Sequence, residues 1–386
     1  MREHSTEGIG GPQGSRSEAA AAVSAPRPLR VAWVAGPQTL EDYGRILQPV
    51  AIGLLDELVE LTAVCPERAD AGALPSPPMK LVRYGRLSWW AFWETAPKVQ
   101  ELAEGVRESG IDLLHALDAG AAPLTIRLSR LAGVRYLVSG YALPDARALG
   151  RLPGAAAGAL AGSAQVLKRM RRRHVVSPDK LHLLRPGVYQ VRHATCFTDP
   201  QRSVTLVAGG RMNDLRAFRA AIRSFADIIA KGYDCACFLL GGGPAEPELR
   251  AAAEKLSLGN ALTFADRQPH ALLSEIFKAA DIYISPVAGR GLDVPCLLAM
   301  AAGVPVLATG QGASDFLREG QTALFFRRGD AADLTARLVG LLEDRASARA
   351  LADRALEHLR EHHRPAAMVA ELARIYRQAS ARNGEG

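Results

Sequence analysis

The 386-residue sequence lacks the features that define several large classes of protein. It has no run of about 18 apolar residues, so no segment is predicted to cross a membrane as a helix. Its five cysteines are scattered and odd in number, which excludes a framework of disulfides. No G-x-G-x-x-G follows the first apolar segment, where the chain reads WVAGPQTL, so a dinucleotide-binding enzyme is not indicated.

The composition indicates a globular protein with anionic partners. Hydrophobic residues make up 48% of the chain, and the net charge is +7 at neutral pH. This charge suits nucleotide diphosphates, acidic phospholipid surfaces or nucleic acid, and nucleic acid is the weakest of the three because only charge favours it. Residues 1–28 have the composition of a flexible tail and no apolar core of a signal peptide. Thiol cysteines and the lack of a signal peptide predict a cytoplasmic location.

Strand-like and helix-like segments alternate along the whole chain. The first half opens with LRVAWVA at 29–35 and a helix over about 40–60, and the second half repeats the scheme from SVTLVAGGR at 203–211 onward. Such alternation predicts a parallel sheet covered by helices on both faces. We therefore predict an α/β protein with two Rossmann-like domains, residues 29–197 and 198–364, that face each other across a cleft.

The stretch 279–330 contains the most specific motif. It reads as a strand (DIYIS), a glycine-broken loop (AGRGLD), a short apolar helix (VPCLLAMAA) and a second strand (VPVLATG). A loop of small residues before a helix presents backbone N–H groups and the positive end of the helix dipole to one place. The sequence therefore predicts a phosphate site at Gly291, Leu292 and Asp293.

These residues resemble the donor-binding signature of the family-four (group 1) glycosyltransferases of GT-B fold. That signature runs E-G-F-G-L-P-x-L-E-A-M-A-x-G-x-P-V-V-A-T, and most of its frame recurs from Gly291 to Thr309. Its E-x7-E motif is degenerate, because Arg290 and Leu298 stand where the family has glutamates. In the family these carboxylates would contact the transferred sugar and hold the ribose hydroxyls. Leu298 can accept no hydrogen bond, and each one lost costs about 1.5 to 3 kcal/mol of donor binding.

The resemblance also implies a pair of cations for the donor diphosphate. Arg211 and Arg216 follow Gly210 at the spacing of the family's arginine and lysine, and would neutralise the leaving group. Arginine in place of lysine keeps the charge and can bind two phosphate oxygens. The alternative is that both arginines are exposed to solvent and bind no ligand. Gly242 and Gly243 after the next strand allow close approach of the donor, or simply form a turn.

The acceptor side of the predicted cleft departs from the family pattern. Tyr141 stands where the family has a histidine, and it either bonds a sugar hydroxyl or lies half-buried at a strand end. Trp89, Trp90 and Trp93 lie among basic residues, which suits a membrane interface, a sugar-stacking platform or core packing. The basic run 167–174 is either a contact with acidic lipid or a solvated face.

Three histidines near the C-terminus, His358, His362 and His363, have a spacing that suits a metal. No carboxylate or cysteine is expected to complete a site, so we predict a surface helix there and no metal.

Two functions fit these observations. The first is transfer of a hexose from a nucleotide-diphosphate sugar with retention, without a metal or other cofactor, and with activity weakened by the two lost glutamates. The acceptor would enter from the first domain and can be lipid-linked, which would place the protein at the inner face of a membrane. The second is an inactive GT-B protein that binds ligands or acts as a scaffold. In this fold the last helix, here 365–386, returns to the first domain.

Overall fold

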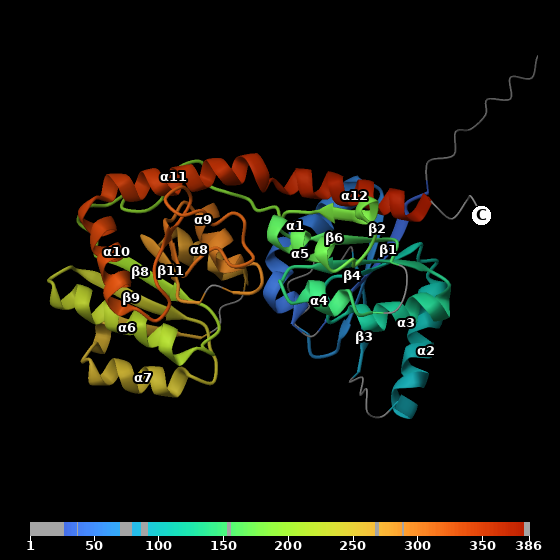
Figure 1. Cartoon of the computed structure of the whole chain (residues 1–386), viewed down its shortest axis with the longest axis horizontal. Coiled ribbons are helices and arrows are strands. Elements are labelled where there is room, and N and C mark those ends of the chain that lie inside the picture. Colours follow the sequence, from blue (N-terminus) through green and yellow to red (C-terminus); the bar gives the residue numbers. More distant parts are fainter. Residues whose placement is uncertain are drawn as a thin grey trace, which may run out of the picture.

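The chain folds into two α/β domains that lie side by side (Figure 1). This computed structural model describes residues 27–36, 38–69, 79–85, 92–152, 156–266, 270–287 and 289–381. The predicted tail therefore lies almost wholly outside the described residues. The predicted α/β class with two Rossmann-like parallel sheets is confirmed.

The first domain is built on a parallel sheet whose described strands run in the order β3-β2-β1-β4-β5-β6-β7. The chain order reverses between β1 and β4, and ligands of doubly wound sheets bind at such a switch point. The strands are β1 (Leu29–Val34), β2 (Val59–Pro66), β3 (Lys80–Tyr84), β4 (Leu113–Ala116), β5 (Arg135–Gly140), β6 (Gly158–Ala161) and β7 (Leu181–Leu183). The helices are α1 (Thr39–Asp56), α2 (Phe92–Glu108), α3 (Ala122–Ala132), α4 (Asp145–Leu149), α5 (Ala164–Arg172) and the short η2 (Pro178–Lys180).

The second domain repeats this plan with the described strands in the order β10-β9-β8-β11-β12-β13. Its switch point lies between β8 and β11. The strands are β8 (Val204–Gly209), β9 (Cys235–Leu240), β10 (Leu262–Ala265), β11 (Ile282–Ser285), β12 (Val306–Ala308) and β13 (Leu324–Phe325). The helices are α6 (Leu215–Ala230), α7 (Glu246–Lys255), the short η3 (Gly259–Ala261), α8 (His270–Lys278), α9 (Val294–Ala301) and α10 (Ala331–Glu343).

Continuous apolar runs produce the central strands of both sheets. All four residues of β4 and all four of β11 are buried, as expected for strands covered by helices on both faces. Trp33 of β1 is fully buried in the first domain, and Phe218 and Phe225 of α6 are fully buried in the second. All five cysteines are buried free thiols. Among the described residues, no helix has both the length and the apolar character needed to cross a bilayer.

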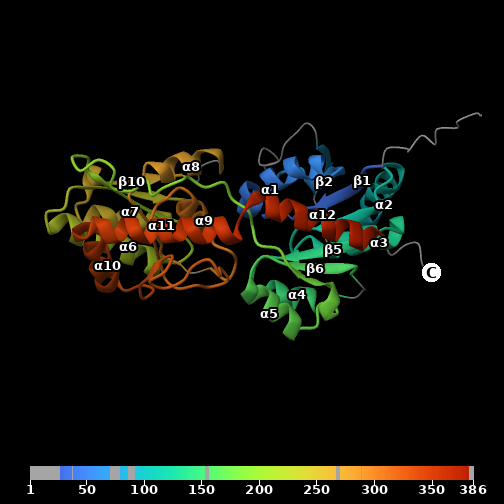
Figure 2. The ribbon, with the colours of Figure 1, turned by 90° about the horizontal axis from the view of Figure 1, so that it is seen from above.

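The last two helices run in line along one side of both domains (Figures 1 and 2). Helix α11 (Arg345–His362) packs on α9 of the second domain, and α12 (Pro365–Ala381) packs on α1 of the first. Proline is favoured at the first position of a helix, where its missing N–H costs nothing, and Pro365 accordingly begins α12.

A buried hydrogen-bond chain anchors α12 to the first sheet. Trp33 Nε1 donates to the hydroxyl of Tyr376, 2.7 Å away, and that hydroxyl lies 2.6 Å from Nδ1 of His115. Nε2 of His115 lies 2.8 Å from the hydroxyl of Ser139. Burial lowers the pKa of His115 to about 3, so its imidazole is neutral near pH 7. Each polar group in this chain has a partner, which removes the cost of burying it.

Candidate functional site

A cavity of about 810 Å³ lies between the two domains. This volume falls within the range of small-molecule sites. The cavity lies at the carboxyl ends of β8, β9 and β11, which include the switch point of the second sheet. From the first domain it is lined by Glu41, Asp42 and Tyr43 of α1 and by Ala142.

Glycine loops after β8 and β9 form part of the cavity wall. Gly210 and Gly242 line the cavity, together with Gly241. Gly241 has a φ of +122°, and a Cβ there would overlap the carbonyl oxygen of Gly210. Gly243 does not line the cavity; a Cβ at this position would meet the carbonyl of Met212. These glycines let the two loops approach closely and expose backbone to the cavity.

Arg211 enters the cavity and meets the first domain there. Its Nη2 lies 2.5 Å from Oδ1 of Asp42, and Nη1 donates to the side-chain oxygen of Gln38 over 3.4 Å. About half of the Arg211 side chain, 46%, remains exposed. The guanidinium that the sequence assigned to the donor diphosphate is therefore held by a carboxylate of the opposite domain.

Arg216 does not line this cavity. It is the second residue of α6, is exposed, and lies over Gly329, where a Cβ would collide with its side chain. Arg328 lines the cavity instead and forms an ion pair with Asp214, Nε to Oδ2, at 2.7 Å. Asp214 also caps α6 by accepting from the N–H of Ala217.

The loop before α9 is closely bonded to its surroundings. The N–H of Leu292 donates to the carbonyl of Tyr141 over 2.9 Å, and the N–H of Asp293 donates to the hydroxyl of Ser314. Oδ1 of Asp293 caps α9 by accepting from the N–H of Cys296, while Oδ2 accepts from the Ser285 hydroxyl over 2.6 Å. Two of the three N–H groups that the sequence assigned to phosphate, those of Leu292 and Asp293, are thus already engaged, and a carboxylate occupies the helix N-terminus. Burial raises the pKa of Asp293.

This loop also joins the two domains. Gly291 forms an antiparallel bridge with Ala142, and the N–H of Leu143 donates to the carbonyl of Arg290 over 2.7 Å. Gly291, Leu292 and Asp293 line the cavity. The side chain of Arg290 is exposed, and Arg290 is not a lining residue.

Leu298 lies outside the cavity wall. It is 6% exposed and belongs to the apolar core around α9. No carboxylate therefore occupies the position where the resemblance places the ribose-binding glutamate.

Tyrosines of both domains surround the cavity. Tyr141 is buried and does not line it, whereas Tyr43, whose ring centroid lies 4.5 Å from that of Tyr141, does. Burial raises the pKa of Tyr141 to about 12, so the phenol is neutral. Trp89 and Trp90 lie outside the described residues, as does the side chain of Trp93.

Tyr283 of β11 is a lining residue that sequence reasoning missed. Its hydroxyl is buried and has no hydrogen-bond partner among the described residues. Its ring meets that of Phe277, also a lining residue, at 4.9 Å. In the sequence Tyr283 is one residue of the apolar strand DIYIS, and no local pattern distinguishes it from a core residue.

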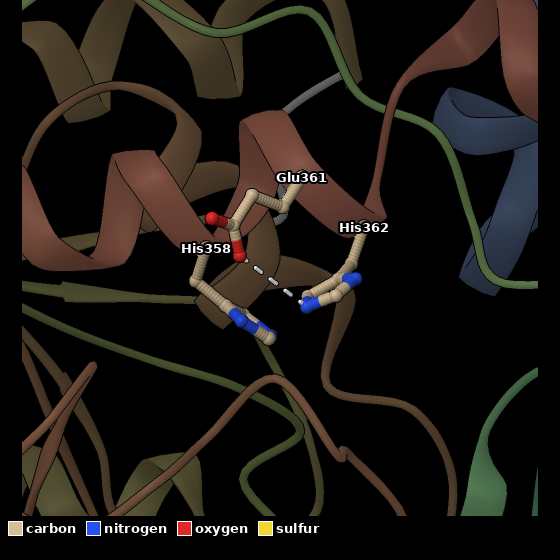
Figure 3. Close-up of side chains that lie close together, drawn as sticks. All are labelled: His358, Glu361 and His362. Carbon is tan, nitrogen blue, oxygen red and sulfur yellow. Dashed lines mark ion pairs between the residues drawn. The ribbon is translucent and has the colours of Figure 1, made fainter.

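The expectation of a surface helix at the C-terminal histidines is wrong for two of them. His358 is 8% exposed and His363 is 1% exposed, and burial lowers the pKa of each to about 4. The face of α11 that covers α9 extends to its last turn. A carboxylate also lies close by, because Glu361 shares that turn with His358 and His362 (Figure 3).

Comparison with solved structures defines the class of fold. The chain is similar to Anabaena HepE in complex with UDP and glucose, with a TM-score of 0.73 and 13% identity over 90% of this chain and 98% of that one. It is also similar to sucrose-phosphate synthase from Thermosynechococcus elongatus, with a TM-score of 0.74 and 18% identity over 92% of this chain and all of that one. At these identities the likeness shows the fold alone, which is GT-B.

Sequence comparison finds similar proteins for the second domain. Residues 203–344 match the family described as "Glycosyl transferases group 1". D-inositol 3-phosphate glycosyltransferase of Nocardia farcinica is 29% identical over 182 residues, which are 45% of this chain and 40% of that protein. 2-deoxystreptamine glucosyltransferase of Streptomyces kanamyceticus is 25% identical over 173 residues, 44% of each chain. The matches thus span less than half of these relatives, and over that stretch the chain is similar to group 1 glycosyltransferases.

Proposed function

We propose that the cleft binds a nucleotide-diphosphate sugar and that the protein transfers its hexose with retention. One observation carries the proposal: Arg211 reaches into an interdomain cavity whose wall is formed by the glycine loops after β8 and β9. The related enzymes of Nocardia and Streptomyces are glycosyltransferases by name, and HepE has been solved with UDP-glucose. The described geometry and these relatives support the same class of ligand.

In this proposal the two cations of the second domain bind the diphosphate. Arg211 and Arg328 both line the cavity, and charge-assisted hydrogen bonds from guanidinium to phosphate are stronger than neutral ones. As the bond from sugar to diphosphate breaks, negative charge grows on the leaving group, and fixed cations stabilise that charge without reorganising. In this proposal Arg328 takes the role that sequence reasoning assigned to Arg216, and Arg216 could bind the donor only if the domain rearranges.

The remaining walls can hold the base, the sugar and the acceptor. Leu273, Phe277 and Tyr283 form an apolar side of the cavity that suits a planar base. Glu41 and Tyr43 line the first-domain side, where the acceptor would enter. An acceptor linked to lipid at an acidic membrane surface remains part of this proposal.

A second function, binding or scaffolding without catalysis, is favoured by a specific observation. Leu298 is buried in the core and Arg290 lies off the cavity wall, so neither lost carboxylate has a substitute at its own position. Donor affinity is accordingly proposed to be weak. The two functions share the cleft and differ in whether the bound donor reacts.

Two measurements separate these functions. The first is thermal unfolding of the full chain with UDP, GDP, ADP and their sugars at millimolar concentration. Ligand at 100 times its Kd stabilises the native state by about 2.7 kcal/mol, which raises Tm by several degrees. If no compound raises Tm, the cleft is not a donor site and the transferase function fails.

The second measurement is release of nucleoside diphosphate from the donor that binds, in the presence of candidate acceptors. Turnover that is abolished in Arg211→Ala supports the transferase, and retention is read from the anomeric coupling of the product by NMR. Binding without turnover supports the scaffold. Restoring both glutamates is a poor test, because a carboxylate at the buried position 298 would destabilise the core.

A further inference from the structure

The last turn of α11 brings together three side chains that can ligate a metal. The ligand atoms of His358, Glu361 and His362 all lie within 4.8 Å of one another (Figure 3). Oε2 of Glu361 is 3.5 Å from Nε2 of His362, and the rings of His358 and His362 are 4.7 Å apart. Histidines four residues apart on one helix face are a recurring zinc-binding arrangement.

One of the three side chains is buried and two are exposed, which suits ion binding. His358 is 8% exposed, so the packing around it restricts the movement of its imidazole. Glu361 and His362 are exposed and can rotate. Zinc binds nitrogen and oxygen at about 2.0 to 2.2 Å, so the three ligand atoms must draw closer, and the two exposed side chains can supply that movement.

A second observation points to the same place. Near His358, Nε2 of His363 and Oδ1 of Asp315 are buried, and neither has a hydrogen-bond partner among the described residues. The ring of His363 lies 5.9 Å from that of His358, and Asp315 acts electrostatically on both histidines. Unsatisfied buried polar atoms are rare in native proteins, and a bound ion or its water ligands would satisfy them.

The neighbouring charges allow a divalent cation. Arg318 acts on His358, and Arg185 acts on His363 and is paired with Asp315 over 3.3 Å, so both arginines oppose the ion. Asp315 and Glu361 favour it. Two imidazoles and a carboxylate are ligands of intermediate hardness. They suit Zn²⁺ and the transition-metal ions Co²⁺, Ni²⁺ and Cu²⁺, whereas Mg²⁺ and Ca²⁺ prefer oxygen ligands alone.

We infer that His358, Glu361 and His362 form a binding site for a divalent transition metal, with Zn²⁺ the best match. The site lies where the chain leaves the second domain for the first. The next residue, His363, is bonded through Nδ1 to the carbonyl of Pro186 over 2.8 Å, and its own carbonyl accepts from the N–H of Val188. All three ligands belong to the last turn of α11, so an ion here would stabilise the end of that helix beside the joint with α12.

The test uses the full chain without a histidine tag, treated with chelator and then dialysed. Zn²⁺ is titrated by calorimetry, and Co²⁺ is added to follow its visible absorption. His362→Ala and Glu361→Gln remove exposed ligands and leave the core untouched, which circular dichroism checks. His193→Ala is the matched control, because His193 is exposed and lies outside the cluster.

We expect one Zn²⁺ per chain, a rise in Tm on loading, and at least about a tenfold loss of affinity in each ligand variant. The control variant should bind as the unmodified chain does. The inference is overturned if the unmodified chain takes up no Zn²⁺ at 1 mM. It is equally overturned if His362→Ala and Glu361→Gln bind as tightly as the control, because the ion would then lie elsewhere.

Discussion

The ion pair between Arg211 and Asp42 predicts opposite effects for its two partners on nucleotide binding. Arg211 Nη2 and Asp42 Oδ1 are 2.5 Å apart, and 46% and 34% of the two side chains are exposed. A phosphate that binds Arg211 must compete with the carboxylate. Asp42→Asn removes the competitor, whereas Arg211→Ala removes the cation.

The structure sets the size of both effects. A solvent-exposed ion pair contributes about 0.2 to 1 kcal/mol, so Asp42→Asn should tighten binding by about 1.5- to 5-fold. A charge-assisted hydrogen bond contributes about 1.5 to 3 kcal/mol, so Arg211→Ala should weaken binding by about 10- to 150-fold. Salt screens exposed charges, so the gain in Asp42→Asn should shrink as ionic strength rises.

The assay is calorimetric titration with UDP, or with whichever nucleotide raises Tm most, at low and high salt. Arg216→Ala is the matched control, because this arginine is near in sequence and exposed but lies off the cavity wall. If Asp42→Asn weakens binding as strongly as Arg211→Ala, the carboxylate contacts the ligand and the reasoning is wrong. If Arg216→Ala matches Arg211→Ala, the pair of cations predicted from the sequence is correct after all.

Three further predictions concern buried polar groups. Tyr376→Phe leaves the N–H of Trp33 and Nδ1 of His115 without a partner, so the free energy of unfolding in urea should fall by about 2 to 4 kcal/mol. A loss under about 0.5 kcal/mol would contradict this. In the folded chain burial lowers the pKa of His115 to about 3, whereas in the unfolded chain this side chain protonates below about pH 6.5. The unfolded state therefore binds one more proton between these pH values. His115 should lower the free energy of unfolding by up to about 1.4 kcal/mol for each pH unit from 6.5 down to 3. Urea unfolding from pH 7 to 4 gives the free energy of unfolding of the unmodified chain and of His115→Gln at each pH. If this free energy falls equally steeply with pH in both chains, the prediction is wrong. Tyr283→Phe removes a hydroxyl with no partner among the described residues and should raise the ligand-free stability by about 1 kcal/mol, whereas a decrease would show that the hydroxyl is satisfied.

The fold was predictable because it depends on local periodicity. Apolar runs such as LRVAWVA and DIYIS, each followed by an amphipathic segment, can bury both faces only in a parallel sheet covered by helices. The glycine loop before α9 and the glycines after β8 and β9 were found for the same reason, since turn chemistry depends on adjacent residues.

The sequence by itself therefore determined the two sheets and the position of the cleft between them. Only the tertiary structure decided which side chains line that cleft. Arg328 enters it although it is far from Arg211 along the chain, Asp42 reaches Arg211 from the other domain, and Leu298 lies in the core. Periodicity tells which face of an element is buried but not what it is buried against, because partners distant in sequence are brought together only by packing. The histidines of α11 show the same limit: their spacing was visible, and their burial depended on where the helix crosses between the domains.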